Sequence, residues 1–269
     1  MIRDITIGQY YKADSVIHRL DPRVKLMGTL IFIISLFMGM NIWIYAVVTV
    51  ALAVVIKMSR IPLKFMVRGL KSIVILIIIS AVFNLFLTPG DVLIQIWKLT
   101  ITYQGLKMAI FMVVRLIYLI VGTSLMTLTT TPNNLTDGLE KGLGFLKVIK
   151  VPVHEIAMMM SIALRFIPIL IEETDKIMKA QMARGADFEN GSLIKRAKAM
   201  VPILVPLFVS AFRRANELAM AMEARCYHGS EGRTKMKPLI YHKRDYIAYG
   251  CIAAYMVISI VVGRLPFLP

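Results

Sequence analysis

Long apolar runs separated by short polar segments fill the first half of the chain, and another such run lies near its C-terminus. Five runs approach the length of about 20 residues that a helix needs to cross the hydrocarbon core of a bilayer. The first two are short and only Met40, Asn41 and Ile42 separate them, which predicts a tight helical hairpin. The five runs cover roughly residues 25–39, 43–56, 73–87, 106–128 and 246–262.

The segment from residue 129 to residue 243 is too apolar for an ordinary loop and too often interrupted by charges to cross a bilayer. It predicts a short helix over residues 135–146, broken by Gly142 and Gly144, a second from Pro152 to about Met182, and a third from Leu193 to about Arg225, after Gly191 and Ser192. In the two long helices, apolar side chains recur at three- and four-residue steps opposite charged ones, as in amphipathic helices. Their internal prolines, Pro168, Pro202 and Pro206, are expected to bend them.

We interpret this segment as a cytoplasmic-side layer of amphipathic helices. The chain is then an all-α integral membrane protein with three parts: an N-terminal arm and four transmembrane helices (1–128), the helical block (129–243) and a fifth transmembrane helix (244–269). An alternative count of seven spans places both long helices across the membrane. The charge-free stretch 199–212 is short for a span, which favours the surface layer.

Composition and charge orient the spans. Hydrophobic residues make up 58% of the chain, against about 45–50% in soluble domains. Of the 32 lysines and arginines, 18 lie between residues 129 and 244, whereas the turn between the first two runs has none. The positive-inside rule therefore predicts a cytoplasmic N-terminus and helical block and an extracellular C-terminus. Anionic membrane lipid explains the net charge of +16 more simply than nucleic acid does.

The apolar faces of the two long helices have two interpretations. Eight of the 19 methionines lie between Met158 and Met222, and methionine suits surfaces that repack against different partners. Such faces either bind a partner protein or form the core of a helical layer, and periodicity alone favours the core.

The two long helices end in similar sequences, each with an arginine between small residues. A cation at an exposed helix C-terminus contributes only about 0.3–1 kcal/mol, so each arginine alone is more simply explained as an ordinary cap. The small neighbours leave each guanidinium projecting, and its planar five-donor fork suits a groove that offers carboxylates or carbonyls. The two sequences are Ala183-Arg184-Gly185 and Ala224-Arg225-Cys226.

With these features the chain resembles a known family over nearly its whole length, the transmembrane T component (EcfT, or CbiQ family) of energy-coupling factor transporters. Residues 183–185 and 222–225 resemble two motifs of that family, and Cys226 departs from the small residue often found after the second arginine. The N-terminal arm resembles its entry signature through Ile7-Gly8-Gln9-Tyr10, Asp14-Ser15 and His18-Arg19-Leu20-Asp21-Pro22-Arg23-Val24-Lys25.

The resemblance implies a coupling subunit of an importer for vitamins or other micronutrients in a prokaryotic plasma membrane. Two cytosolic ABC ATPases would bind the chain, which would itself hold a membrane substrate-binding S component. ATP-driven closure of the ATPases would then move the two long helices and reorient the S component. The ATPase-docking residues implied are Ala183, Arg184, Gly185, Ala224, Arg225 and Cys226. The S-component contacts implied are Met159, Met160, Ala163, Ile167, Ile171, Leu204, Phe208, Ala211 and Met222.

The sequence carries no phosphate-binding loop, hydrolase or metal-ligand motif. We therefore expect no catalytic residue, metal or cofactor, and ATP hydrolysis by partner subunits. The alternative is a self-contained permease or membrane-embedded enzyme whose cytoplasmic helices brace the spans. Arg115 lies near the middle of the fourth run. It is expected to pair with a polar group of a neighbouring span, with Asn84 as a candidate, or else to serve a substrate or proton path.

Overall fold

The computed structural model describes residues 10–39, 41–71, 73–96, 99–186, 188, 192–229 and 236–264, which excludes Ile7, Gly8 and Gln9 of the arm signature and Gly191. The chain divides into two compact units. Among the described residues, the bundle unit is formed by residues 10–139 and 239–264, and the crossed-helix unit by residues 140–238.

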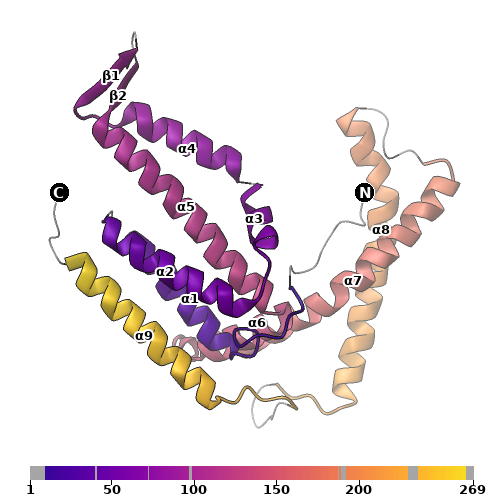
Figure 1. The fold of residues 1–269 in the computed structure, drawn as a ribbon. Coiled ribbons are helices and arrows are strands. Elements are labelled where there is room, and N and C mark those ends of the chain that lie inside the picture. Colours follow the sequence, from indigo (N-terminus) through magenta and orange to yellow (C-terminus); the bar gives the residue numbers. More distant parts are fainter. Residues whose placement is uncertain are drawn as a thin grey trace. The chain divides into compact units, whose positions relative to one another are not determined.

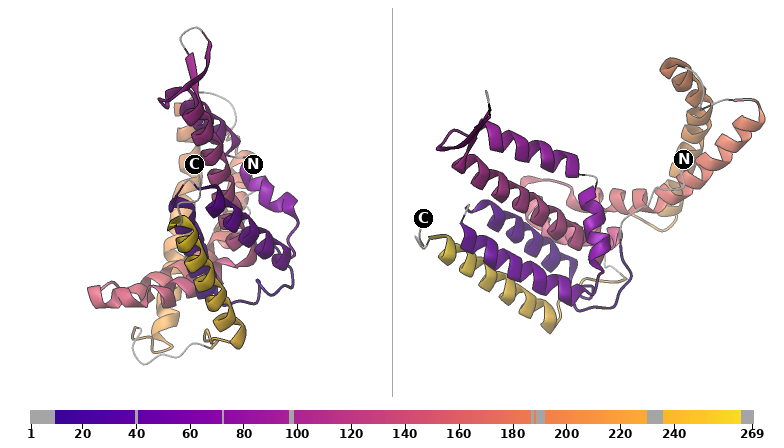
Figure 2. Two further views of the ribbon diagram at one scale, coloured as in Figure 1. Left: turned by 60° about the vertical axis from the view of Figure 1, so that its left-hand side comes forward. Right: turned by 45° about the horizontal axis from the view of Figure 1, so that its top comes forward.

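The bundle unit consists of helices that run alongside one another, with one β-hairpin (Figures 1 and 2). Its elements are α1 (Pro22–Phe37), α2 (Ile42–Ser59), α3 (Leu63–Lys71), α4 (Val74–Leu87), β1 (Val92–Ile96), β2 (Leu99–Thr102), α5 (Tyr103–Thr129) and α9 (Lys243–Arg264). The crossed-helix unit contains the 3-10 helix η1 (Gly144–Ile149), α7 (Val153–Ala183) and α8 (Leu193–Glu223). The sequence of α6 (Pro132–Gly142) runs across the boundary between the units.

Side-chain caps explain where several bundle helices begin. Asp21 accepts a hydrogen bond from the Arg23 amide (2.9 Å) before α1, and Pro22 occupies the first turn, where its missing N–H costs nothing. Asn41 accepts from the Trp43 amide (3.2 Å) before α2. Thr102 accepts from the Gly105 amide (3.0 Å) before α5. Each cap satisfies a backbone donor that the first helical turn leaves unpaired.

The predicted apolar runs correspond to helices. The runs at 43–56, 106–128 and 246–262 lie in α2, α5 and α9, and those at 25–39 and 73–87 match α1 and α4. Within the described residues, α2, α5, α7 and α9 are long and apolar enough to cross a membrane, and α3 with α4, bent by 64°, adds a fifth candidate. This confirms an all-α integral membrane protein with about five spans. The set of candidate spans differs from the predicted set in two helices. α1 has only 16 residues, whereas α7, which was predicted to lie on the membrane surface, is long and apolar enough to cross the membrane.

Two further elements differ from the sequence prediction. β1 and β2 pair antiparallel between α4 and α5, in a segment for which no element was predicted. The short helix expected over residues 135–146 begins earlier, at Pro132, whereas its predicted break at Gly142 and Gly144 is confirmed, because α6 ends at Gly142 and η1 begins at Gly144. Both long helices contain their prolines within continuous helix: Pro168 lies inside α7, and Pro202 and Pro206 lie inside α8.

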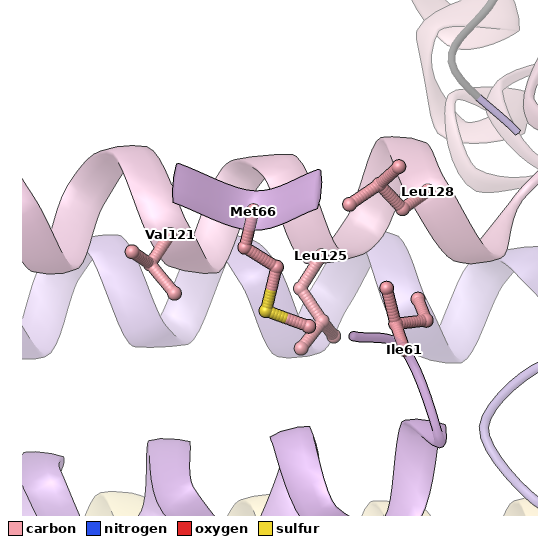
Figure 3. Close-up of a cluster of buried hydrophobic side chains, with 5 residues drawn as sticks. All are labelled: Ile61, Met66, Val121, Leu125 and Leu128. Carbon is pink, nitrogen blue, oxygen red and sulfur yellow. The ribbon is translucent and has the colours of Figure 1, made fainter. Parts of the chain in front are cut away.

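Two clusters of buried apolar side chains hold the bundle together. In the first, Ile61 and Met66 pack against three residues of α5, Val121, Leu125 and Leu128 (Figure 3). The second cluster joins α1 to α2 and consists of Leu36, Ile44, Tyr45 and Val48, with side chains of α5 and α9 around it.

The N-terminal arm is fixed to the bundle by polar contacts. The Tyr11 amide donates to the Leu128 carbonyl at the end of α5 (2.9 Å). His18 bonds through Nδ1 to the Ser15 hydroxyl (2.7 Å) and through Nε2 to the Tyr11 carbonyl (3.0 Å). At the start of α9, the carboxylate of Asp245, which is 1% exposed, accepts from the amide of Asp21 (2.9 Å). These contacts attach the arm and the start of α1 to the end of α5 and to the start of α9.

Candidate functional site

The crossed-helix unit is built on α7 and α8, which have 31 residues each. They pack against each other and run in opposite directions (Figure 1). The contacts establish the direction, because Glu173 meets Ser210 while Gln181, further along α7, meets the earlier residue Pro202. Ser192 caps α8 by accepting from the Lys195 amide (3.4 Å).

An ionic contact joins the two helices near their crossing. The carboxylate of Glu173 on α7 accepts from the hydroxyl of Ser210 and from the guanidinium of Arg214 (3.0 Å), both on α8. The side chains of Glu173 and Arg214 are 22% and 37% exposed, so the ion pair is half-buried. Such a pair contributes about 0–1 kcal/mol, and its value here lies in fixing the register of α7 on α8.

The C-terminus of α7 forms a Schellman motif, in which two backbone amides beyond the helix bond back to its last turn. The Ala186 amide donates to the Gln181 carbonyl (3.0 Å), and the Gly185 amide donates to the Met182 carbonyl (2.9 Å). Gly185 has φ of +86°, the left-handed conformation that this motif requires and that glycine adopts without steric cost. Arg184 is therefore the residue immediately before the left-handed turn.

The C-terminus of α8 forms the same motif. The Tyr227 amide donates to the Met222 carbonyl (3.0 Å), and the Cys226 amide donates to the Glu223 carbonyl (2.8 Å). Cys226 has φ of +55°, so it occupies the left-handed position that Gly185 occupies on α7. Arg225 is thus the structural equivalent of Arg184. The departure at Cys226 leaves the cap intact, at the steric cost of a side chain in left-handed backbone.

Both arginines point their charge at solvent. Arg184 and Arg225 are exposed, as are Ala183 and Ala224 before them, and neither guanidinium has a partner among the described residues. Because α7 and α8 are antiparallel, the two arginines lie at opposite ends of the pair. Ile162 of α7 and Met222 of α8 line the same groove between the two helices. Each lies roughly 20 residues along its helix from the contact between Gln181 and Pro202, which corresponds to a length of roughly 30 Å at the rise of an α-helix.

The residues expected to contact a partner on the apolar faces divide into two groups. Met159, Met160, Ala163, Ile167, Leu204 and Phe208 are exposed, whereas Ile171, Ala211 and Met222 are half-buried. The exposed apolar surface of α8 also includes residues absent from the sequence prediction, Val205, Val209 and Phe212. Their four- and three-residue spacing could have identified them, because it continues the apolar pattern of the charge-free stretch 199–212.

Ala211 and Met222 instead line a groove of about 290 Å³ between the two helices. Ile162, Phe166 and Leu170 form its α7 wall, and Ala215, Leu218 and Ala219 lie on the α8 side with Arg214. These two predicted contacts therefore face the partner helix of the same unit, as the core interpretation expected for part of the apolar surface.

The remaining candidate residues have structural partners. Arg115 donates to the hydroxyl of Tyr45 on α2 (3.0 Å), while the Asn84 amide donates to the Ser80 carbonyl of its own helix (2.8 Å). The neighbouring-span partner of Arg115 is therefore Tyr45 and the Asn84 candidate is wrong. His154 bonds to the carboxylate of Glu140 (2.9 Å). In the described part of the chain, no group of His, Cys, Asp and Glu side chains could hold a metal ion.

The fold and composition define a multi-pass, all-α integral membrane protein that carries a separate unit of two crossed amphipathic helices. The family model of CbiQ, described as cobalt transport protein, matches residues 13–236. The chain belongs to this family, the transmembrane EcfT components of energy-coupling factor transporters.

The similar curated proteins agree over nearly full length. The energy-coupling factor transporter transmembrane protein EcfT of Clostridium kluyveri is 56% identical over 263 residues, which covers 97% of each chain. The EcfT of Ruminiclostridium cellulolyticum is 52% identical and covers 99% of this chain and 100% of its own. The EcfT of Bacillus subtilis is 48% identical and covers 91% of this chain and 93% of its own.

Proposed function

We propose that this chain is the coupling subunit of an energy-coupling factor importer for vitamins or other micronutrients. Two cytosolic ABC ATPases bind the exposed ends of α7 and α8, and a membrane S component that carries the substrate binds the apolar faces of the same helices. ATP is hydrolysed by the partner subunits. Closure of the ATPases moves the crossed-helix unit, and this motion reorients the S component.

The observation that carries this proposal is the equivalence of the two helix ends. Arg184 and Arg225 precede left-handed residues in identical Schellman motifs, and both are exposed with small neighbours. A single capping arginine needs no partner to explain it. Two equivalent C-termini lie at opposite ends of one packed helix pair, separated by roughly the width of a small domain, and this arrangement suits two separate protein surfaces.

The chemistry of arginine fits this role. The guanidinium presents five donors in a plane and binds carboxylates or clustered carbonyls with defined geometry. Ala183 and Ala224 keep the approach open, because a larger side chain there would shield the guanidinium. Each Schellman motif fixes the backbone from which the arginine projects, which reduces the entropy lost on docking.

We further propose that α7 and α8 lie along the cytoplasmic surface. The length and composition of α7 alone also fit a span. However, its half-buried Glu173 is paired with Arg214 of α8, and a helix pair shares one environment where it crosses. An ion pair is costly in hydrocarbon and tolerated at an interface. With the basic residues concentrated in this block, the N-terminus is cytoplasmic and the C-terminus extracellular.

The test is charge reversal at both ends. Loss of one arginine hot spot typically costs about 2 kcal/mol or more, so Arg184→Glu with Arg225→Glu should lower the recovery of ATPases with the purified chain by well over tenfold. ATP-driven uptake should be lost in the same strain. The matched control is Arg165→Glu with Arg213→Glu, which makes the same charge change at exposed positions within α7 and α8, away from their ends.

A self-contained permease or membrane enzyme makes the opposite prediction. Its activity and its subunit composition would be the same in both double variants. Recovery of the unaltered chain from native membranes with no ATPase attached would also contradict the coupling proposal.

A further inference from the structure

Arg115 is a buried cation within the bundle unit. It lies on α5 and is only 8% exposed, its Nε donates to the Tyr45 hydroxyl (3.0 Å), and its guanidinium carbon lies 5.2 Å from the centre of the Phe37 ring. Within the described residues no carboxylate pairs with it. The terminal guanidinium nitrogens have no acceptor in that part of the chain, yet they are not sealed from the surface.

The neighbours of Arg115 place it at the level of the α1–α2 turn, where we infer a membrane boundary, although it lies midway along α5. Phe37 is the last residue of α1, and Tyr45 lies in the first turn of α2, four residues after the polar cap Asn41. Four helical residues span about 6 Å. The charged end of α9 marks the same level, since a methyl group at Gly263, beside Arg264, would lie 3.4 Å from Ile44.

A buried charge without a counter-ion is unfavourable. The long side chain of an arginine about one helical turn below the lipid headgroups can extend so that its guanidinium lies among them. Phe37 lies beside the guanidinium, and Ile42 and Trp43 are exposed large side chains of the same α1–α2 turn, which we take as the apolar rim of the site. A ligand for this site therefore needs one negative charge with planar acceptor oxygens and an apolar body beside it.

We propose that Arg115 binds the phosphodiester of an anionic phospholipid in the leaflet that the α1–α2 turn faces. The guanidinium fork engages two phosphate oxygens, and the acyl chains lie against the apolar rim. A phosphatidylglycerol headgroup neutralises Arg115, whereas phosphatidylcholine brings its own cation. This site is separate from the coupling surface and does not depend on the proposed function.

The test is native mass spectrometry of the full chain in non-ionic detergent, titrated with dioleoyl phosphatidylglycerol or dioleoyl phosphatidylcholine. The first phosphatidylglycerol should bind about fivefold more tightly than the first phosphatidylcholine, the ratio expected for one cation near the membrane surface. Arg115→Gln should bring the two lipids to parity. Arg264→Gln removes a cation from the same level of the bundle and should leave the preference unchanged.

Tyr45→Phe is a second variant that distinguishes loss of the charge from loss of the local structure. It removes the hydrogen-bond partner of Arg115 Nε and keeps the positive charge, so it should retain the preference for phosphatidylglycerol. The proposal is overturned by equal binding of the two lipids to the unaltered chain, by loss of the preference in Tyr45→Phe or Arg264→Gln, or by its persistence in Arg115→Gln. Millimolar inorganic phosphate should not displace phosphatidylglycerol, and displacement would identify a free-anion site instead.

Discussion

The two helix ends differ in the residue that holds the left-handed turn, and exchanging these residues should have opposite effects. An L-residue in left-handed backbone costs about 1–2 kcal/mol, while glycine loses about 0.5–1 kcal/mol more conformational entropy on folding than alanine. Gly185→Ala, at φ of +86°, should therefore weaken the α7 cap by about 1 kcal/mol. Cys226→Gly, at φ of +55°, should strengthen the α8 cap by roughly 0.5–1 kcal/mol.

Hydrogen exchange measured by mass spectrometry reports these local changes. The amides of Gly185 and Ala186 close the α7 cap, so about 1 kcal/mol corresponds to roughly fivefold faster exchange in Gly185→Ala. The amides of Cys226 and Tyr227 should exchange more slowly in Cys226→Gly. Gly250→Ala is the control, because Gly250 lies within α9 and a methyl group there would contact no neighbouring atom. Unchanged exchange at the α7 end, or faster exchange at the α8 end, would refute the reasoning.

Three further predictions concern the stability of the bundle unit, which is measured by thermal unfolding of the purified chain. Gly105→Ala should destabilise it by about 1–3 kcal/mol, because the new methyl group would lie 2.9 Å from a backbone oxygen of α4, whereas Gly250→Ala should not. Asp245→Asn should cost about 1–3 kcal/mol, because the Asp21 and His242 amides bond to different carboxylate oxygens and the NH2 group of asparagine would replace one of these acceptors. Burial lowers the pKa of His18, so the arm should be most stable above about pH 6.5 and weaken as pH falls, a dependence that His18→Gln should remove.

The helices of the bundle could be predicted from the sequence because the thickness of the bilayer fixes the length of an apolar run. The run at 106–128 became α5, Tyr103–Thr129, and the run at 246–262 became α9, Lys243–Arg264. The β-hairpin between α4 and α5 was missed, because strands of five and four residues carry too little periodicity to be recognised.

The helix ends were predictable to different degrees. Gly185 indicates a left-handed cap, because glycine is the usual residue at that position. Cys226 gives no such signal, since residues other than glycine rarely adopt positive φ, and only the structure shows that the second helix end repeats the first.

The environment of Arg115 could not be predicted from its position in the run. A residue near the middle of α5 was expected at mid-membrane, but the short α1–α2 hairpin ends beside it. Depth in the membrane depends on the neighbouring helices, and a single apolar run does not reveal them.

The central claim is that both ends of the crossed pair meet ATPases, and site-specific photo-crosslinking tests it most directly. Ala180 and Ala221 each lie four residues before one of the two arginines and are both exposed, so each can carry a single cysteine in a chain with Cys226→Gly and Cys251→Ser. With a benzophenone maleimide attached in native membranes, both positions should crosslink to ATPase subunits. Crosslinks confined to lipid or to the chain itself, at either position, would contradict the account.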